Sequence, residues 1–172
     1  MQIYVVTLNV ETYICIINFY TMKIGEAIQQ KKFTSEFQKV AINIAFTSNW
    51  LMTNHQTRIK KFGITPQQFN ILRILRGQYP KAATVNLLID RMLDKSSNAS
   101  RLVEKLRVKG FVERVICPDD RRAVDVIITK AGLKLLSQLD GHMETWEEDL
   151  KSISVSEAKQ LNILLDKLRT KK

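Results

Sequence analysis

A run of polar residues between positions 95 and 105 carries side chains suited to binding a nucleic acid. The amide of an asparagine can form two hydrogen bonds with adenine, and the guanidinium of an arginine can form two with guanine. Serine hydroxyls and lysine ammonium groups suit phosphate oxygens, which set the register of a protein on DNA. A routine solvated helix face would hold similar residues, so the surrounding elements decide between the two readings. The candidate residues are Lys95, Ser97, Asn98, Ser100, Arg101 and Lys105.

A second candidate is the turn-like segment Cys117-Pro118-Asp119-Asp120-Arg121-Arg122. Paired arginines at a projecting turn can enter the minor groove, whose narrow A·T-rich stretches attract guanidinium groups. Asp120 can accept hydrogen bonds from turn N–H groups or from an arginine and so hold the tip in one shape. The segment predicts three further DNA contacts, namely Asp120, Arg121 and Arg122.

Hydrophobic spacing indicates the elements that must position these residues. Apolar residues recur every three or four positions in six segments, and β-branched residues alternate in two segments on either side of the charged turn. Thr65, Pro66 and Gln68 form a complete helix-start signal, and Ser156 is the expected cap of the last helix. The expected helices are about 33–61, 66–77, 84–93, 96–109, 130–150 and 156–169, and the expected strands are 111–116 and 123–129.

Two short helices followed by a β-hairpin form a winged helix-turn-helix, whose second helix lies in the major groove of DNA. The predicted fold is therefore mainly α with a small β-wing. The predicted domains are a dimerisation helix at 22–62, a DNA-binding lobe at 63–132 and C-terminal dimerisation helices at 133–172. Residues 1–21 lack the features of a signal peptide and of a membrane span, and we expect an extension of doubtful origin there.

The net charge of +10, from 27 Lys and Arg against 17 Asp and Glu, suits a polyanionic partner. Seven basic residues and no acids occur from Phe37 to Ile89, whereas five acids and no Lys or Arg occur from Asp140 to Asp149. Such a division can present a basic side to DNA, and the alternative is that the two blocks pair with each other. No membrane role is expected, because the apolar helix faces are needed for a core.

Residues for other kinds of chemistry are scarce. Cys15 and Cys117 are too few and too isolated for a disulfide framework or a zinc site, and the histidines add no ligand cluster. No glycine-rich phosphate loop occurs. We therefore expect no catalytic, cofactor-binding or metal-binding residues, and no enzyme. A thiol beside two arginines has a lowered pKa in principle, yet most lone cysteines are inert, and redox sensing at Cys117 is not expected.

The sequence resembles the MarR family of regulators over about residues 33–169. The resemblance rests on the run from Asp94 to Leu106, on Lys109-Gly110-Phe111-Val112-Glu113-Arg114, and on Asp120-Arg121-Arg122 followed by Thr129-Lys130-Ala131-Gly132. It implies a cytoplasmic homodimer on a palindromic operator, usually a repressor that a small aromatic molecule releases. Cys117 stands where the family commonly has an acid. The cysteine that senses oxidants in some members would fall near Ala41, so that mechanism is not supported.

The main hypothesis is thus a sequence-specific regulator of transcription that binds double-stranded DNA. The alternative is a winged-helix interaction module whose basic face binds an acidic protein partner. The two differ in one observable property, because only the first predicts binding to duplex DNA that weakens steeply with salt.

Overall fold

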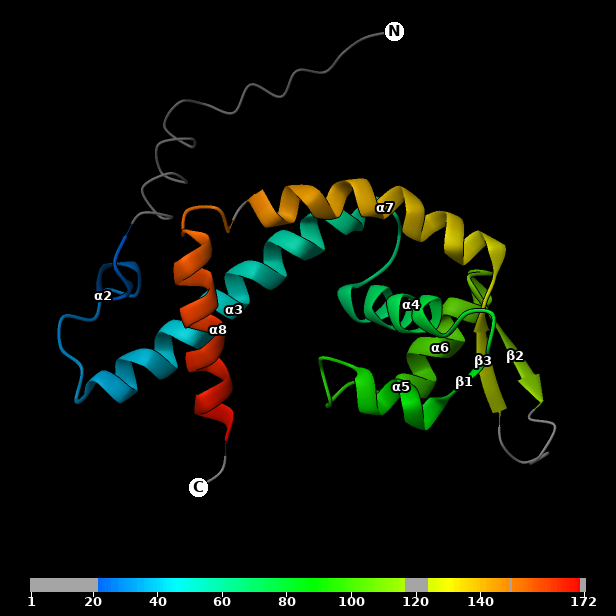
Figure 1. Cartoon of the computed structure of the whole chain (residues 1–172), viewed down its shortest axis with the longest axis horizontal. Helices are drawn as coiled ribbons and strands as arrows, with labels where there is room; N and C mark the ends of the chain where they lie inside the picture. Colours follow the sequence, from blue (N-terminus) through cyan, green and yellow to red (C-terminus); the bar gives the residue numbers. More distant parts are fainter. Residues whose placement is uncertain (1–21, 117–123, 149, 171–172) are drawn as a thin grey trace, which may run out of the picture. The chain divides into compact units, whose positions relative to one another are not determined.

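Figure 1 shows the computed structural model of the chain. It describes residues 22–116, 124–148 and 150–170, without the side chains of residues 116, 124 and 142–146. The chain divides into two compact units, Met1–Leu51 and Met52–Lys172, and one helix continues from the first into the second. The extension at 1–21, Cys117 and the wing residues Asp120, Arg121 and Arg122 lie outside the described residues.

The first unit contains a short helix, α2 (Ile24–Ala27), and the beginning of the long helix α3 (Glu36–Lys60). Helix α2 was not predicted from the sequence. Helix α3 has 25 residues and lies within the expected range 33–61, and Ser35 Oγ accepts a hydrogen bond from the N–H of Gln38 at its start. Phe37, Val40 and Ile44 are exposed on α3.

The second unit begins its helix-turn-helix at α4 (Pro66–Gln78), where the predicted start signal is confirmed. Thr65 Oγ1 accepts a hydrogen bond from the N–H of Gln68, and the Gln68 side chain accepts one from the N–H of Thr65. This capping box satisfies two N–H groups that the helix itself cannot bond. Gly63, just after α3, has a φ of +69°, a conformation that favours glycine.

Helices α5 (Val85–Arg91) and α6 (Ala99–Val108) follow. Strands β2 (Val112–Ile116) and β3 (Val124–Ile128) form the predicted antiparallel hairpin, with Val112 opposite Ile128. A two-residue strand, β1 (Ala83–Thr84), completes the sheet in the order β1-β3-β2 and pairs Ala83 with Val126. Figure 1 shows α4, α5 and α6 beside this sheet.

The chain ends with α7 (Lys130–Glu148) and α8 (Val155–Arg169). The predicted cap of the last helix was wrong by two residues. Ser154, and not Ser156, caps α8, because Glu157 stands three residues after Ser154 and closes a capping box with it. None of the helices in the described ranges is long and apolar enough to span a membrane.

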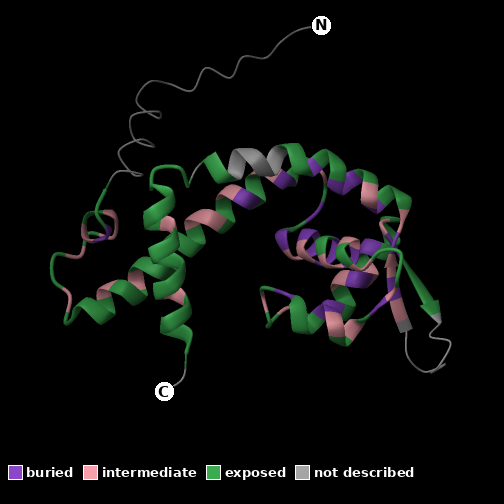
Figure 2. Ribbon diagram, viewed as in Figure 1, coloured by how far each residue is buried: buried purple, intermediate pink, exposed green. Residues whose placement is uncertain are grey.

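One hydrophobic core holds the second unit together. Figure 2 shows buried residues on the inner sides of α4, α6 and the sheet and on the first half of α7. The end of α3 contributes Ile59, α4 contributes Leu72 and Leu75, and α7 contributes Leu136 and Leu139. Burial of this apolar surface, at about 25 cal/mol per Å², is what fixes α6 in one orientation.

Candidate nucleic-acid interface

Helix α6 has one buried side and one polar side. Ala99, Val103 and Leu106 are buried at the three- and four-residue spacing of a helix face. Ser100, Arg101 and Lys105 are exposed on the other side, with Arg101 and Lys105 one turn apart. The fold therefore brings three of the six predicted recognition-helix residues onto one solvent-facing surface.

The other three candidates lie before the helix, since α6 begins at Ala99 and not near Ser96 as expected. Asn98 is the N-cap, and its Oδ1 accepts a hydrogen bond from the N–H of Arg101. Ser97 Oγ donates to Asp94 Oδ2. Lys95 Nζ donates to the backbone oxygens of Ile89 and Asp90. All three side chains thus make contacts that order the turn between α5 and α6.

Asp94 organises this turn, although no role was predicted for it from the sequence. Its carboxylate accepts hydrogen bonds from the N–H and Oγ of Ser96 and from the Oγ of Ser97. These bonds lower the pKa of Asp94 to about 2. Asn70 connects α4 to this turn, because its Oδ1 accepts a hydrogen bond from the N–H of Leu93. An aspartate two residues before a serine, a typical turn signal, could have identified Asp94.

The base of the hairpin is joined to the end of α6 through Thr129. Its Oγ1 donates to the carbonyl oxygen of Gly110 at 2.7 Å and accepts from the N–H of Gly132 at 3.1 Å. Position 132 has no room for a side chain, because a Cβ there would lie 2.4 Å from the carbonyl oxygen of Phe111. The Thr129–Gly132 motif therefore packs the start of α7 directly against the chain that follows α6.

Comparisons with known proteins agree with this architecture. A family model described as "MarR family" matches residues 62–123. The transcriptional regulator PecS of Dickeya dadantii is 24% identical over 110 residues, which cover 63% of this chain and 66% of PecS. The regulator MhqR of Bacillus subtilis is 27% identical over 113 residues, which cover 64% of this chain and 75% of MhqR.

Solved structures share the fold. A MarR-like regulator from Bacillus cereus has a TM-score of 0.70 at 23% identity, over 78% of this chain and 96% of that one. The MepR–DNA complex from S. aureus has a TM-score of 0.68 at 22% identity, over 80% and 97% of the two chains. Bordetella bronchiseptica BpsR, whose DNA binding is regulated by 6-hydroxynicotinic acid, has a TM-score of 0.68 at 21% identity, over 77% of this chain and 94% of BpsR.

The chain matches the MarR family model over residues 62–123, and it is similar to transcriptional regulators over 63–64% of its length. It is a DNA-binding transcriptional regulator of the winged helix-turn-helix class. In this winged helix-turn-helix α6 occupies the place of the recognition helix, and the strands β2 and β3 form the wing.

Helix α6 also carries an acid, Glu104, which was not singled out from the sequence. Glu104 accepts three hydrogen bonds from Arg107, of which the shortest joins Nη2 to Oε1 at 2.8 Å. Arg114 of β2 lies with its Nη2 3.3 Å from Glu104 Oε2. The hydrogen bonds from Arg107 lower the pKa of Glu104, and the positive charges of Arg107 and Arg114 lower it further. The three-residue spacing could have indicated Arg107 but not Arg114.

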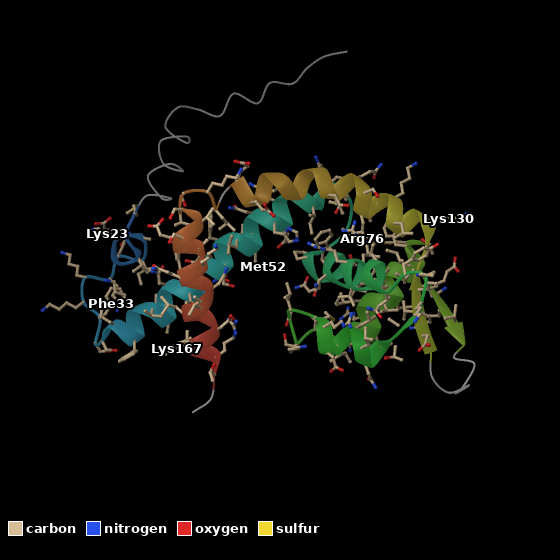
Figure 3. All side chains as sticks on the ribbon, viewed as in Figure 1. Lys23, Phe33, Met52, Arg76, Lys130 and Lys167 are labelled. Atoms are coloured by element: carbon tan, nitrogen blue, oxygen red, sulfur yellow. The ribbon has the colours of Figure 1, made fainter. Side chains whose placement is uncertain are left out.

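One ion pair joins the two charge blocks of the sequence within the described residues, between α4 and α7. Arg76, labelled on α4 in Figure 3, donates to both carboxylate oxygens of Asp140 on α7, at 2.7 and 3.1 Å. The alternative that the basic and acidic blocks pair with each other thus holds for this pair. Arg101 and Lys105 of α6 are exposed, so their charge faces solvent.

Proposed function

We propose that this regulator binds an inverted-repeat duplex as a homodimer, with one α6 helix in the major groove of each half-site, and represses transcription until an effector releases it. The observation that carries the proposal is the polar side of α6, where Ser100, Arg101 and Lys105 face solvent opposite the buried Val103 and Leu106. A helix with this division can enter the groove while its apolar side stays in the core.

Exposed apolar residues on α8 support the homodimer. Leu161, Leu164 and Leu168 recur at helical spacing, and each is between 48% and 62% exposed. A contiguous apolar surface of this kind is typical of an interface between subunits. A second copy of the same chain covers it most simply, in a two-fold symmetric arrangement. Two-fold symmetry places the half-sites about 10 base pairs apart.

The wing completes the proposed contact. Arg121 and Arg122 follow the strand β2, and we assign them to the minor groove, with Asp120 bracing the turn. Because the minor groove carries a degenerate code, these residues contribute affinity and a preference for A·T-rich flanks.

The proposals that the chain is a repressor and that an effector releases it are based on similar proteins. Among proteins of the same fold, 6-hydroxynicotinic acid regulates DNA binding by BpsR, and MepR has been solved in complex with DNA. We propose that a small aromatic acid releases this chain from DNA as well, and that the chain acts in the bacterial cytoplasm, where its operator lies.

Selection from a random duplex pool with the full chain tests the proposal. We expect the bound pool to converge on an inverted repeat. The logarithm of the affinity should fall linearly with the logarithm of the salt concentration, with a slope near −0.9 for each phosphate neutralised. Sedimentation should give a dimer at micromolar concentration, and 6-hydroxynicotinic acid is the first effector to add. A pool that stays random, with binding to acidic proteins instead, favours an interaction module and overturns the proposal.

A further inference from the structure

The cluster formed by Glu104, Arg107 and Arg114 (the Glu104 cluster) links two elements that DNA binding uses separately. Glu104 and Arg107 belong to the recognition helix α6, and Arg114 belongs to the wing strand β2. We propose that Glu104 is a positioning residue that holds the wing at a set distance and angle from the recognition helix. This inference rests on the proposed function, since it concerns how two contacts with one duplex are kept in register.

Glu104 is the only acid in the α6 segment Ala99–Val108, beside Lys105 and three residues after Arg101. A carboxylate in that place opposes the approach of phosphates. Arg107, bonded through two of its nitrogens, and Arg114 offset its negative charge. The Glu104 carboxylate can therefore bind both the helix residue Arg107 and the strand residue Arg114. At the same time, the two arginines compensate the negative charge that it would present to DNA.

The position of Arg114 in β2 allows its ion pair with Glu104 to restrict the orientation of the hairpin. Arg114 stands in the middle of β2, opposite Val126 of β3, and β2 ends two residues later at Ile116. The base of the hairpin is already joined to the end of α6 through Thr129 and Gly110. The ion pair between Arg114 and Glu104 is a second connection to α6, and it prevents the hairpin from rotating about its base. The direction in which β2 and β3 extend is then set by two points and not by one.

Glu113 provides a matched control. It precedes Arg114 on β2, and both line one shallow surface hollow together with Glu104 and Arg107. Glu113→Gln removes the same charge as Glu104→Gln from the same hollow, without touching the ion pairs of the Glu104 cluster. Any effect of charge alone should appear in both variants, whereas an effect of positioning should appear only in Glu104→Gln.

The first experiment measures the free protein. Amide hydrogen exchange of residues 112–116 should be about two- to fivefold faster in Glu104→Gln than in the wild-type chain, in line with the modest strength of an exposed ion pair. Glu113→Gln should match the wild type. Arg114→Gln should accelerate exchange as Glu104→Gln does, and the double variant should add nothing further. Equal exchange in all five proteins would overturn the proposal whether or not the chain binds DNA.

The second experiment measures binding to two duplexes that share the selected inverted repeat and differ only in the A·T content of their flanks. In Glu104→Gln the preference for A·T flanks should shrink by about two- to fivefold, with discrimination at the bases under α6 unchanged. Tighter binding of both variants to every duplex, with the flank preference intact, would show that Glu104 acts only through its charge and overturn the proposal. A wild-type chain without sequence preference would overturn the proposed function, and hydrogen exchange would still decide the role of Glu104.

Discussion

The side chain of Asn98 accepts a hydrogen bond from the backbone N–H of Arg101, with Oδ1 and N 3.0 Å apart. The residue predicted to bind adenine therefore also caps the helix that carries the predicted guanine contact. A change at Asn98 can weaken DNA binding by two routes, through the lost amide and through a frayed helix start. Substitutions that keep the cap separate the routes.

Asn98→Ser should keep the cap, because serine is as good an N-cap as asparagine, whereas Asn98→Ala should reduce the free energy of unfolding by about 0.5–2 kcal/mol. If Asn98 also reads a base, the serine variant should lose sequence preference at one position without losing stability. Urea unfolding and titration of the selected duplex measure the two effects. A serine variant that binds like the wild type would assign Asn98 to capping alone.

Substitutions of Arg101 and of Lys105 should weaken DNA binding in different ways. Arg101→Ala is expected to weaken binding to the selected site by about 1–3 kcal/mol and to relax the preference at one base pair, because a bidentate contact is lost. Lys105→Ala should weaken binding to all duplexes alike and make the salt slope shallower by about one unit. Fluorescence anisotropy on selected and scrambled duplexes at several salt concentrations distinguishes them. The same response from both variants would contradict the proposed placement of α6 in the groove.

Gly132→Ala should destabilise the second unit by about 1–3 kcal/mol, because the new methyl group overlaps the backbone of Phe111 and the side chain of Ile128. Gly141 lies on the same helix with no atom within 4 Å of a Cβ built there, and Gly141→Ala should stabilise the helix by about 0.5–1 kcal/mol. Thermal unfolding of the two variants gives the comparison. Similar effects in both would mean that the contact between α7 and Phe111 is looser than described.

His55 should make stability depend on pH. Its ring packs against Phe69, and burial, together with the nearby charge of Arg58, lowers the pKa of His55 below its ordinary 6.5. As the pH falls below 6.5, the unfolded chain binds a proton that the folded chain does not, so the free energy of unfolding decreases. Urea unfolding between pH 7.5 and 5 should show a smaller decrease for His55→Gln than for the wild type. Equal slopes would count against a buried neutral His55.

The start of α4 was placed correctly from the sequence, whereas the starts of α6 and α8 were not. Thr65 and Gln68 lie at the spacing of a capping box, so α4 was placed correctly from the sequence. Before α6, Ser96, Ser97 and Asn98 are all capable caps, and only the three-dimensional turn around Asp94 selects Asn98. The strand β1 has two residues, too few to show any alternation.

The residue types of the candidate site could be predicted, but not which partners they have within the chain. Periodicity assigns Arg101 and Lys105 to the exposed side of α6, and the structure agrees. The hydrogen bond from Lys95 to the backbone of α5 depends on how the chain turns between α5 and α6. The ion pair between Glu104 and Arg114 depends on how the sheet packs on α6. Local sequence patterns do not reveal such packing between separate segments.

The order β1-β3-β2 has a consequence for solubility at high concentration. Strand β3 is central, paired on one side by β2 and on the other by β1, so most of its backbone groups have partners. In this sheet β2 is an edge, and an edge strand is a template on which another chain can add a strand and start aggregation. Neighbouring opposite charges at Glu113 and Arg114 make β2 a poor template, because an incoming apolar strand would have to desolvate them. An apolar substitution at Glu113 would therefore be expected to leave folding nearly unchanged and to lower the concentration at which the protein precipitates.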